Sequence, residues 1–151
     1  IEYFGIDANK EFVTNGNKIL NKFGLNTRLI NLRVEDFRGK FDHIICMNFL
    51  SNIENYHKNL ERMLLSAKKS VILRESIDKK NDYKYVLDKY LDNSKKDLSV
   101  YVNTYDIKEF VKFIESYNFE VKVLKDKRTD GKKEVIIDYP HYWKFVVATK
   151  K

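Results

Sequence analysis

The chain has 151 residues, of which 43% are hydrophobic and 34% are charged. It is therefore long enough to bury a core, and its composition is that of an ordinary globular domain. No apolar run approaches the length of a membrane span and no signal-peptide pattern is present, so we expect a cytoplasmic protein with no membrane partner. The single cysteine, Cys46, excludes an intrachain disulfide.

The net charge of +7 raises the question of a nucleic-acid partner. Only six of the 29 basic residues are Arg, and the lysines are spread along the whole chain. Arg is the residue that contacts phosphates and bases through two parallel hydrogen bonds. The charge pattern therefore favours a solvated lysine surface and argues against a nucleic-acid partner.

The residue pattern of positions 1–34 predicts a strand, a helix and a second strand. Residues 1–6 form an apolar run that ends at Asp7, and Asn9 is a suitable N-cap for the helix that follows. Gly24 can adopt the positive φ that commonly ends a helix. Residues 27–34 then predict the next strand.

Residues 41–50 begin polar and then become almost wholly apolar. An apolar run without alternation is typical of a strand that lies inside a parallel sheet with both faces buried. A turn of buried helix is the alternative, but ten residues is short for a helix. Asn48 interrupts the run at its downstream end, which is where ligands bind in open α/β sheets.

The second part of the chain continues the alternation. The pattern predicts a helix of about four turns over residues 53–67 and an apolar strand over 70–73. The stretch 78–103 is less regular, and we expect a helical insertion or lid there, with a short amphipathic helix through residues 83–91. The remaining predicted elements are a helix capped by Asp106, a strand over 119–124, a hairpin turn at 129–132 with a returning arm at 134–138, and a last strand over 143–148.

This order predicts an α/β domain with a mostly parallel, Rossmann-like sheet. Helices cover both faces of the sheet, and the closing strands form an antiparallel hairpin at the C-terminal end. We expect a single domain over residues 1–151, with the insertion at about 78–103.

With these elements in place, the chain resembles the class I (Rossmann-like) S-adenosylmethionine-dependent methyltransferases. The resemblance covers nearly the whole chain. It implies the transfer of a methyl group from S-adenosylmethionine to a small-molecule or sugar-like acceptor. The segments that carry it are Gly-Ile-Asp-Ala at 5–8, Val-Glu-Asp-Phe at 34–37, the strand at 41–50, the helix and strand at 60–73 and the terminal Trp-Lys-Phe-Val-Val-Ala-Thr-Lys.

The glycine-rich loop that follows the first strand in this family has no counterpart here. None of the five glycines forms a Gly-x-Gly, and Gly5 precedes Asp7 as expected for the family's second strand. The resemblance thus implies a fragment that lacks the first strand and helix and is catalytically impaired. The family's sheet has the strand order 3-2-1-4-5-7-6, in which residues 41–50 correspond to strand 4 and would lie beside strand 1. Without strand 1, residues 41–50 would have an unpaired edge or would pair directly with the strand of Asp7.

Five residues are expected to bind the cofactor at the ends of the first two strands. Asp7 stands at a strand end beside a helix N-terminus, where a carboxylate can accept hydrogen bonds from both hydroxyls of a ribose. The resemblance implies this role for Asp7 with Ala8, and a surface aspartate that caps the helix is the alternative. Arg33, Val34 and Glu35 align with the residues that contact adenine. Many members have an acidic residue at the position of Arg33, so adenine recognition would rest on Arg33 or on the backbone of the other two.

Met47, Asn48 and Phe49 end the central strand, where the family's cofactor and substrate meet, and plain core packing is the alternative. The segment is not the Asn/Asp-Pro-Pro-aromatic motif of methyltransferases that act on exocyclic or amide nitrogens. This difference argues against adenine-N6 and glutamine-amide substrates.

The acceptor side is expected to include Glu75, Tyr139, His141 and Trp143. Methyl transfer from a sulfonium depends mainly on alignment, and a base is needed only when the acceptor loses a proton. The catalytic residue stays unassigned, with His141 as the principal candidate, because the start of an antiparallel last strand lies where the parallel strands end. An aromatic edge that packs on the domain is the alternative. Further candidates for a base are His57, Asp138 and Tyr142.

No metal site is predicted, because the three histidines are far apart and lack cysteine partners. Two other functions stay open: an NAD or nucleotide-sugar Rossmann enzyme, and a non-catalytic basic module that binds RNA. The sequence does not determine the acceptor atom or the oligomeric state.

Overall fold

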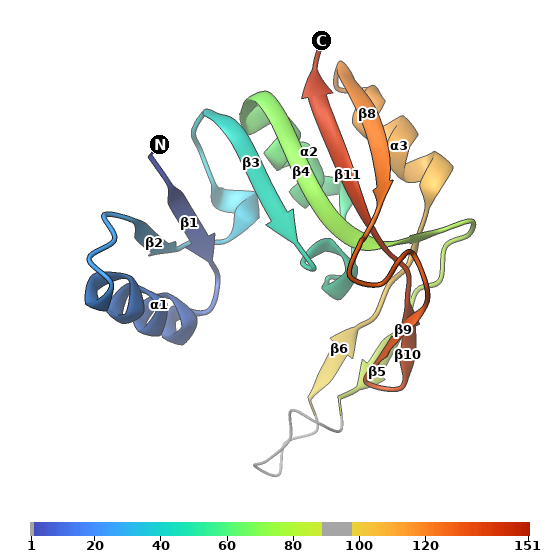
Figure 1. Ribbon diagram of the computed structural model, residues 1–151, viewed down its shortest axis with the longest axis horizontal. Coiled ribbons are helices and arrows are strands. Elements are labelled where there is room, and N and C mark those ends of the chain that lie inside the picture. The colour runs from blue at the N-terminus through green and yellow to red at the C-terminus, as the bar shows by residue number, and fades with distance from the viewer. Residues whose placement is uncertain (1, 89–97) are drawn as a thin grey trace. The chain divides into compact units, whose positions relative to one another are not determined.

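The computed structural model of the chain describes residues 2–88 and 98–151. The chain divides into two compact units, residues 1–39 and residues 40–151. Each unit has its own secondary structure and is described by itself (Figure 1). The prediction of a single domain over residues 1–151 stays a prediction.

The first unit is a β-α-β arrangement. Strand β1 (Phe4–Asp7) and strand β2 (Arg28–Asn31) pair in parallel, and helix α1 (Lys10–Lys22) connects them. As predicted, the Asn9 side chain caps α1, since its Oδ1 accepts hydrogen bonds from the next helical N–H groups. Gly24, with a φ of 64°, follows the C-cap. Strand β2 is shorter than predicted, because a 3-10 turn, η1 (Val34–Asp36), begins where the strand was expected to end.

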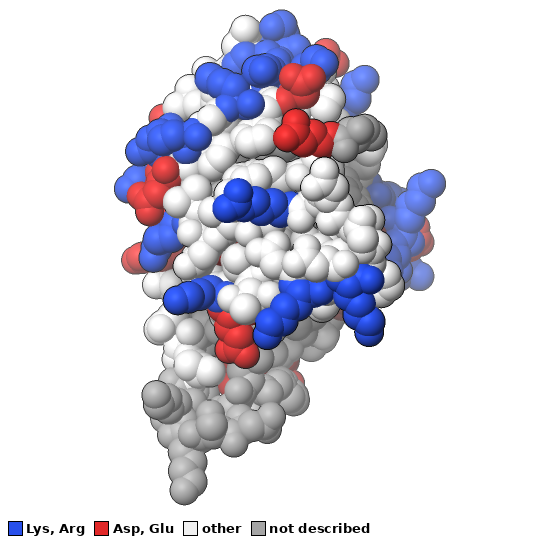
Figure 2. Space-filling view, turned by 90° about the vertical axis from the view of Figure 1, so that its left-hand side faces the viewer, with Lys and Arg blue, Asp and Glu red and all other residues white. Residues whose placement is uncertain are grey.

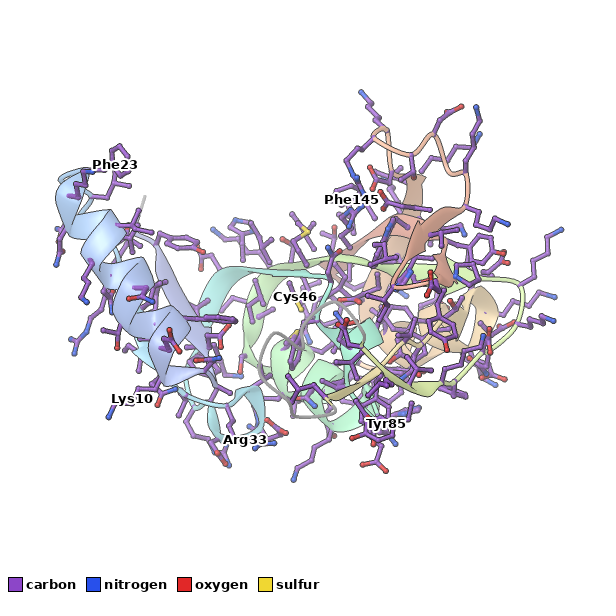
Figure 3. The ribbon with its side chains drawn as sticks, turned by 90° about the horizontal axis from the view of Figure 1, so that it is seen from below. Lys10, Phe23, Arg33, Cys46, Tyr85 and Phe145 are labelled. Atoms are coloured by element: carbon purple, nitrogen blue, oxygen red, sulfur yellow. The ribbon has the colours of Figure 1, made fainter. Side chains whose placement is uncertain are left out.

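Helix α1 packs closely on β2. The Asn17 side chain donates to the backbone carbonyl of Leu29 and accepts from its backbone N–H, both at 2.9 Å. At the preceding residue, a Cβ atom on Gly16 would lie 2.4 Å from Leu29 Cδ1, so any larger residue would force the Leu29 side chain to move. Figure 3 shows Lys10 and Phe23 at the two ends of this helix.

The second unit contains a mixed sheet with the strand order β3-β4-β11-β8. Strands β3 (Phe41–Met47) and β4 (Ala67–Asp78) are parallel, whereas β11 (Trp143–Lys150) lies antiparallel between β4 and β8 (Phe119–Lys125). The short β7 (Tyr105–Asp106) adds a parallel pairing to the end of β4. The antiparallel closing strands are confirmed, but a mostly parallel sheet is not.

Helices α2 (His57–Ser66) and α3 (Ile107–Glu115) cover one face of this sheet (Figure 1). Both helices are shorter than the apolar pattern. A separate 3-10 turn, η2 (Leu50–Asn52), precedes α2, which begins only at His57. As predicted, Asp106 caps α3 by accepting from two backbone N–H groups. The fully buried side chains under these helices include Leu60, Leu64, Val71, Leu73, Phe110, Ile114 and Val146.

The prediction that both faces of the central strand are buried is wrong within the second unit. Cys46 is buried, whereas its neighbour Ile45 is 60% exposed. The reason is that the described helices of this unit lie on the Cys46 face, while Phe145 on β11 points to the other face (Figure 3). Within this unit β3 pairs with β4 alone, so its second edge has no strand partner in the described part of the unit.

Two predictions beyond the central sheet are corrected. The helix expected through residues 83–91 is replaced, where the structure describes it, by strand β5 (Tyr85–Leu87), which pairs with β6 (Ser99–Tyr101). Residues 89–97 of the expected insertion lie outside the described residues.

The second correction concerns the arm at 134–138, which does not return along β8. Instead β9 (Glu134–Ile136) pairs with β10 (Tyr139–His141), and β11 takes the place beside β8. The two residues between β9 and β10, Ile137 and Asp138, both have positive φ, as a tight hairpin turn requires. No helix in the described ranges, 2–88 and 98–151, is long and apolar enough to cross a membrane.

Candidate functional site

In the first unit, Asp7 lies at the exposed edge where the two parallel strands end. The register places Asp7 beside Asn31, and the backbone carbonyls of Asp7 and Ala8 accept hydrogen bonds from the Asn31 amide at 3.1 and 2.9 Å. One carboxylate oxygen of Asp7, Oδ1, accepts from the Asn9 N–H at 2.7 Å. The other, Oδ2, has no hydrogen-bond donor among the described residues, so it is available to a ligand.

Arg33, Val34 and Glu35 follow one residue after β2, where Arg33 is the N-cap of η1 and Val34 and Glu35 are its first two residues. The Arg33 guanidinium lies 3.3 Å from a carboxylate oxygen of Glu35, and its side chain is 69% exposed (Figure 3). An exposed pair of this kind contributes little to stability. The structure thus brings the five residues predicted for ribose and adenine to the ends of one parallel strand pair.

Asn31 is a residue of this edge that the sequence reasoning missed. Its side chain fixes the backbone of Asp7 and Ala8 from the neighbouring strand. A polar residue at the end of an apolar strand was the available signal, and it was used for Asp7 but not for Asn31.

In the second unit, Asn48 forms a strained turn directly after β3. Its φ is 54°, a left-handed conformation that asparagine tolerates better than most residues. Two hydrogen bonds to Arg74 hold it, one from the Asn48 N–H to the Arg74 carbonyl at 2.8 Å and one from Arg74 Nη1 to Asn48 Oδ1 at 2.5 Å. Met47, just before the turn, is 43% exposed.

Glu75 is fully buried beneath this turn. Its Oε1 accepts from the N–H groups of Phe49 and Leu50, each at 3.1 Å, and its Oε2 accepts from the N–H and the hydroxyl of Ser51 at 2.9 and 2.8 Å. Desolvation raises the pKa of Glu75, although the hydrogen bonds from residues 49–51 act in the opposite direction. The carboxylate therefore faces the backbone of its own chain.

The carbonyl groups of the same turn are held from a different segment. The Tyr105 hydroxyl donates to the Leu50 carbonyl, and the Asn103 N–H donates to the Ser51 carbonyl at 2.9 Å. The Asn103 side chain also donates to the Ile53 carbonyl at 2.8 Å. Residues 48–53 are thus fixed by hydrogen bonds to both their N–H and their carbonyl groups.

Arg74 is the centre of a second buried network, which the sequence reasoning also missed. Its Nε and Nη2 donate to Asp126 Oδ2 at 2.8 and 2.5 Å, and its guanidinium lies 4.5 Å from the centre of the Trp143 ring. Desolvation by itself would raise the pKa of Asp126, but hydrogen bonds from the Arg128 backbone and from Arg74 outweigh it and lower the pKa.

His141 and Trp143 extend this network. Their rings stack with centres 4.8 Å apart, and Trp143 Nε1 donates to Glu134 at 2.6 Å. His141 is buried, and its Nδ1 lies 3.1 Å from the Tyr139 carbonyl. A carbonyl can only accept, so the neutral ring carries its proton on Nδ1 and a lone pair on Nε2. Desolvation lowers the pKa of His141, which favours this neutral form.

The structure therefore joins two of the predicted acceptor-side residues, His141 and Trp143, to Asn48 through Arg74. Tyr139 contributes its carbonyl to His141, and its ring lies 5.9 Å from the Lys84 ammonium. As predicted, the antiparallel last strand begins near the end of a parallel strand, since Trp143, the first residue of β11, pairs with Ser76 near the end of β4.

A surface depression of about 320 Å³ lies elsewhere in the second unit, over α2 and α3. It includes His57, one of the further candidates for a base, but none of the residues predicted to bind the cofactor or to line the acceptor side. Its lining residues are Tyr56, His57, Glu109, Lys112, Phe113 and Ser116.

Comparisons with known proteins find relatives by structure alone. No family model matches the chain, and no curated protein sequence does. Magnesium protoporphyrin IX methyltransferase from Synechocystis, crystallised with bound SAM, is similar with a TM-score of 0.65 and 12% identity, over 98% of this chain and 59% of that chain. An S-adenosylmethionine-dependent methyltransferase from Clostridium acetobutylicum has a TM-score of 0.67 and 12% identity, over 99% of this chain and 75% of that one.

The O-methyltransferase of a Brevibacillus brevis polyketide synthase, in complex with S-adenosyl-L-homocysteine, has a TM-score of 0.68 and 12% identity, over 99% of this chain and 59% of that chain. The chain has the methyltransferase fold. The resemblance seen in the sequence is thereby confirmed for the fold. This chain spans 59 to 65% of the length of the first three similar structures.

Proposed function

We propose that the chain is an S-adenosylmethionine-dependent methyltransferase domain that acts on a small-molecule or sugar-like acceptor. The observation that carries the proposal is the likeness of nearly the whole chain to methyltransferases whose structures hold SAM or S-adenosylhomocysteine. The acceptors named for two of those proteins, magnesium protoporphyrin IX and 1,6-didemethyltoxoflavin, are small molecules.

The residues of the first unit fit the nucleoside part of this cofactor. Asp7 presents an oxygen without a donor at the exposed end of a parallel strand, where it can accept a hydrogen bond from a ribose hydroxyl. Val34 and Glu35 lie in the 3-10 turn after the neighbouring strand, where they would contact the adenine. When bound, the cofactor would supply a methyl group on a cationic sulfur, which needs alignment more than covalent help.

The residues of the second unit are proposed to serve the reacting end. Met47, Asn48 and Phe49 would contact the cofactor, and Tyr139, His141 and Trp143 would line the acceptor site. If the acceptor must lose a proton, the Nε2 lone pair of His141 is the base that the geometry favours, because the ring is neutral and its tautomer is fixed by the Tyr139 carbonyl.

Calorimetric titration with S-adenosylhomocysteine tests the proposal. We expect the chain to bind it, and the Asp7→Asn variant to bind at least about tenfold more weakly, because a hydrogen bond to a charged acceptor is lost. Asp130→Asn is the matched control, since Asp130 is an exposed aspartate in a turn of the second unit. Absence of binding by the unaltered chain would overturn the proposal.

The same titration separates the two other functions considered from the sequence. Selective binding of NAD would favour the dinucleotide enzyme, although the antiparallel closing strands of the sheet argue against it. Figure 2 shows Lys and Arg side chains scattered over the visible face with acidic side chains between them, rather than gathered in one stripe. An RNA-binding module would instead show an RNA affinity that falls steeply with salt concentration.

A further inference from the structure

We propose that Glu75 is a positioning residue, whose buried carboxylate holds the turn at residues 49–51 in the shape that the cofactor site requires. This inference rests on the proposed function and differs from the substrate contact that the sequence predicts for Glu75. It assigns the residue to the backbone of the site rather than to the acceptor.

The contacts of the carboxylate carry the inference. Three consecutive N–H groups, those of Phe49, Leu50 and Ser51, point at its two oxygens from 2.9 to 3.1 Å, and the Ser51 hydroxyl adds a fourth donor at 2.8 Å. The Glu75 side chain has no exposed surface, so water cannot take the place of any of these donors. A substrate could reach this carboxylate only by displacing the turn.

The donors require an acceptor without hydrogens of its own. An ionised carboxylate offers about four lone-pair positions and no donor, which suits the four N–H and O–H donors that converge on it. The Cys46 thiol, with its Sγ 4.0 Å from Oε1, is a weaker fifth donor. A glutamine amide would keep one oxygen but turn an NH₂ group toward the N–H groups on its other side. Leaving buried N–H groups unpaired is costly, so the turn would have to move in a Glu75→Gln variant.

The turn also begins with a residue in an unfavourable backbone conformation, so its shape depends on the hydrogen bonds that fix it. Asn48 has a positive φ and is tied to Arg74, the residue next to Glu75 on β4. Adjacent residues on one strand therefore fix the left-handed residue and the three N–H groups that follow it. Because Met47, Asn48 and Phe49 are the residues proposed to contact the cofactor, the shape of this turn determines where they lie.

Amide hydrogen exchange tests the hold on the turn without any ligand. In Glu75→Gln we expect the amides of residues 49–51 to exchange at least about tenfold faster, while the amide of Val146 in the middle of the sheet stays protected. Ser51→Ala removes the hydroxyl donor to Glu75 and the acceptor of the Ser76 N–H, but it keeps the three N–H contacts of the carboxylate. Its effect on the amides of residues 49–51 should therefore be smaller, and the variant should fold. Glu120→Gln, on an exposed position of β8, is the matched control. Unchanged exchange at residues 49–51 in both Glu75→Gln and Ser51→Ala would overturn the inference.

Calorimetry with S-adenosylhomocysteine then tests the link to the cofactor. We expect Kd to rise about tenfold in Glu75→Gln, by a smaller factor in Ser51→Ala, and not in Glu120→Gln. Faster exchange at residues 49–51 with an unchanged Kd would overturn the positioning role. If the unaltered chain fails to bind while the exchange result is as expected, the proposed function fails and the hold of Glu75 on the turn stands.

Discussion

The ends of β1 and β2 and the ends of β3 and β4 present the same kind of sequence, a polar residue after an apolar strand, but opposite physical settings. Asp7 and Arg33 are exposed, and one oxygen of Asp7 has no donor among the described residues. Arg74 and Glu75 are buried, and each is bonded to several groups of the protein.

The difference shows that a polar residue at a strand end can either stay exposed or support the backbone around it. In the first unit the short loop between β1 and α1 leaves the Asp7 carboxylate in solvent. In the second unit the turn after β3 folds over the end of β4, and the side chains there satisfy its N–H and carbonyl groups. Substitutions at the second edge should therefore cost stability, whereas those at the first edge should cost affinity.

The largest effect is expected for Arg74→Met. Removing the guanidinium leaves the buried Asp126 carboxylate without its ion pair, which we expect to lower the free energy of unfolding by about 3 kcal/mol. Urea unfolding followed by the fluorescence of Trp143, the only tryptophan, measures it. Arg128→Met is the control, because the Arg128 side chain is 61% exposed and its pair with Glu134 should contribute much less to stability. Equal effects of the two substitutions would contradict the comparison.

A smaller loss is expected for Tyr105→Phe. The substitution removes the donor to the Leu50 carbonyl, which belongs to a fully buried residue of the turn. We expect the same unfolding measurement to show a loss of about 1 to 2 kcal/mol. Tyr85→Phe, on an exposed ring in β5, should leave stability nearly unchanged. A loss near zero for Tyr105→Phe would show that the turn does not depend on this bond.

A pH dependence of stability is expected from His141, with an effect below that of Arg74→Met. Its pKa in the folded state is lowered from 6.5 by desolvation, so the unfolded chain takes up the proton first as the pH falls. The contribution of His141 is therefore present above about pH 6.5 and is lost as the pH falls below it. Unfolding at about pH 8 and pH 5.5 should show a smaller decrease in His141→Gln than in the unaltered chain.

Asp126 does not interfere with that measurement. Its lowered pKa makes its contribution present above 3.8 and lost only as the pH falls through the folded-state value, outside the window. A decrease of the same size in the unaltered chain and in His141→Gln would rule out the buried neutral histidine.

The smallest effect on stability is expected for Asp7→Asn. The carboxylate is exposed and makes one hydrogen bond within the protein, so the loss should stay within about 0.5 kcal/mol by far-UV circular dichroism. The same variant should show the tenfold loss of affinity for S-adenosylhomocysteine proposed above. A stability loss as large as that of Tyr105→Phe would mean that Asp7 serves the backbone, like Glu75.

Much of the fold follows from local sequence. The Asn9 and Asp106 caps, the glycine after α1, the end of β1 at Asp7 and the strand at 119–124 are decided within a few residues by hydrogen bonding and backbone freedom, which a single sequence displays. The antiparallel closing strand was also predictable, because the order of elements allows few connections.

The elements that were predicted wrongly depend on partners distant in the chain. Residues 83–87 have apolar spacing compatible with a helix, yet residues 85–87 pair with residues 99–101. Residues 134–136 pair with residues 139–141 because β11 already occupies the edge of β8. Local spacing cannot show which of two strands pairs with a given edge strand, since that depends on packing across the whole sheet.

For the site, the sequence by itself determined where the polar residues fall, namely Asp7, Asn48, Glu75 and His141 at or beside strand ends. Only the tertiary structure decided what each of them faces. Asp7 keeps one oxygen without a donor among the described residues, whereas Glu75 lies under the turn of residues 49–51. Arg74 binds both Asn48 and Asp126, which lies 52 residues after it in the chain. The physical reason is that burial and hydrogen-bond partners come from segments far away in the sequence. They decide whether a carboxylate stays exposed, as Asp7 does, or supports the backbone, as Glu75 does.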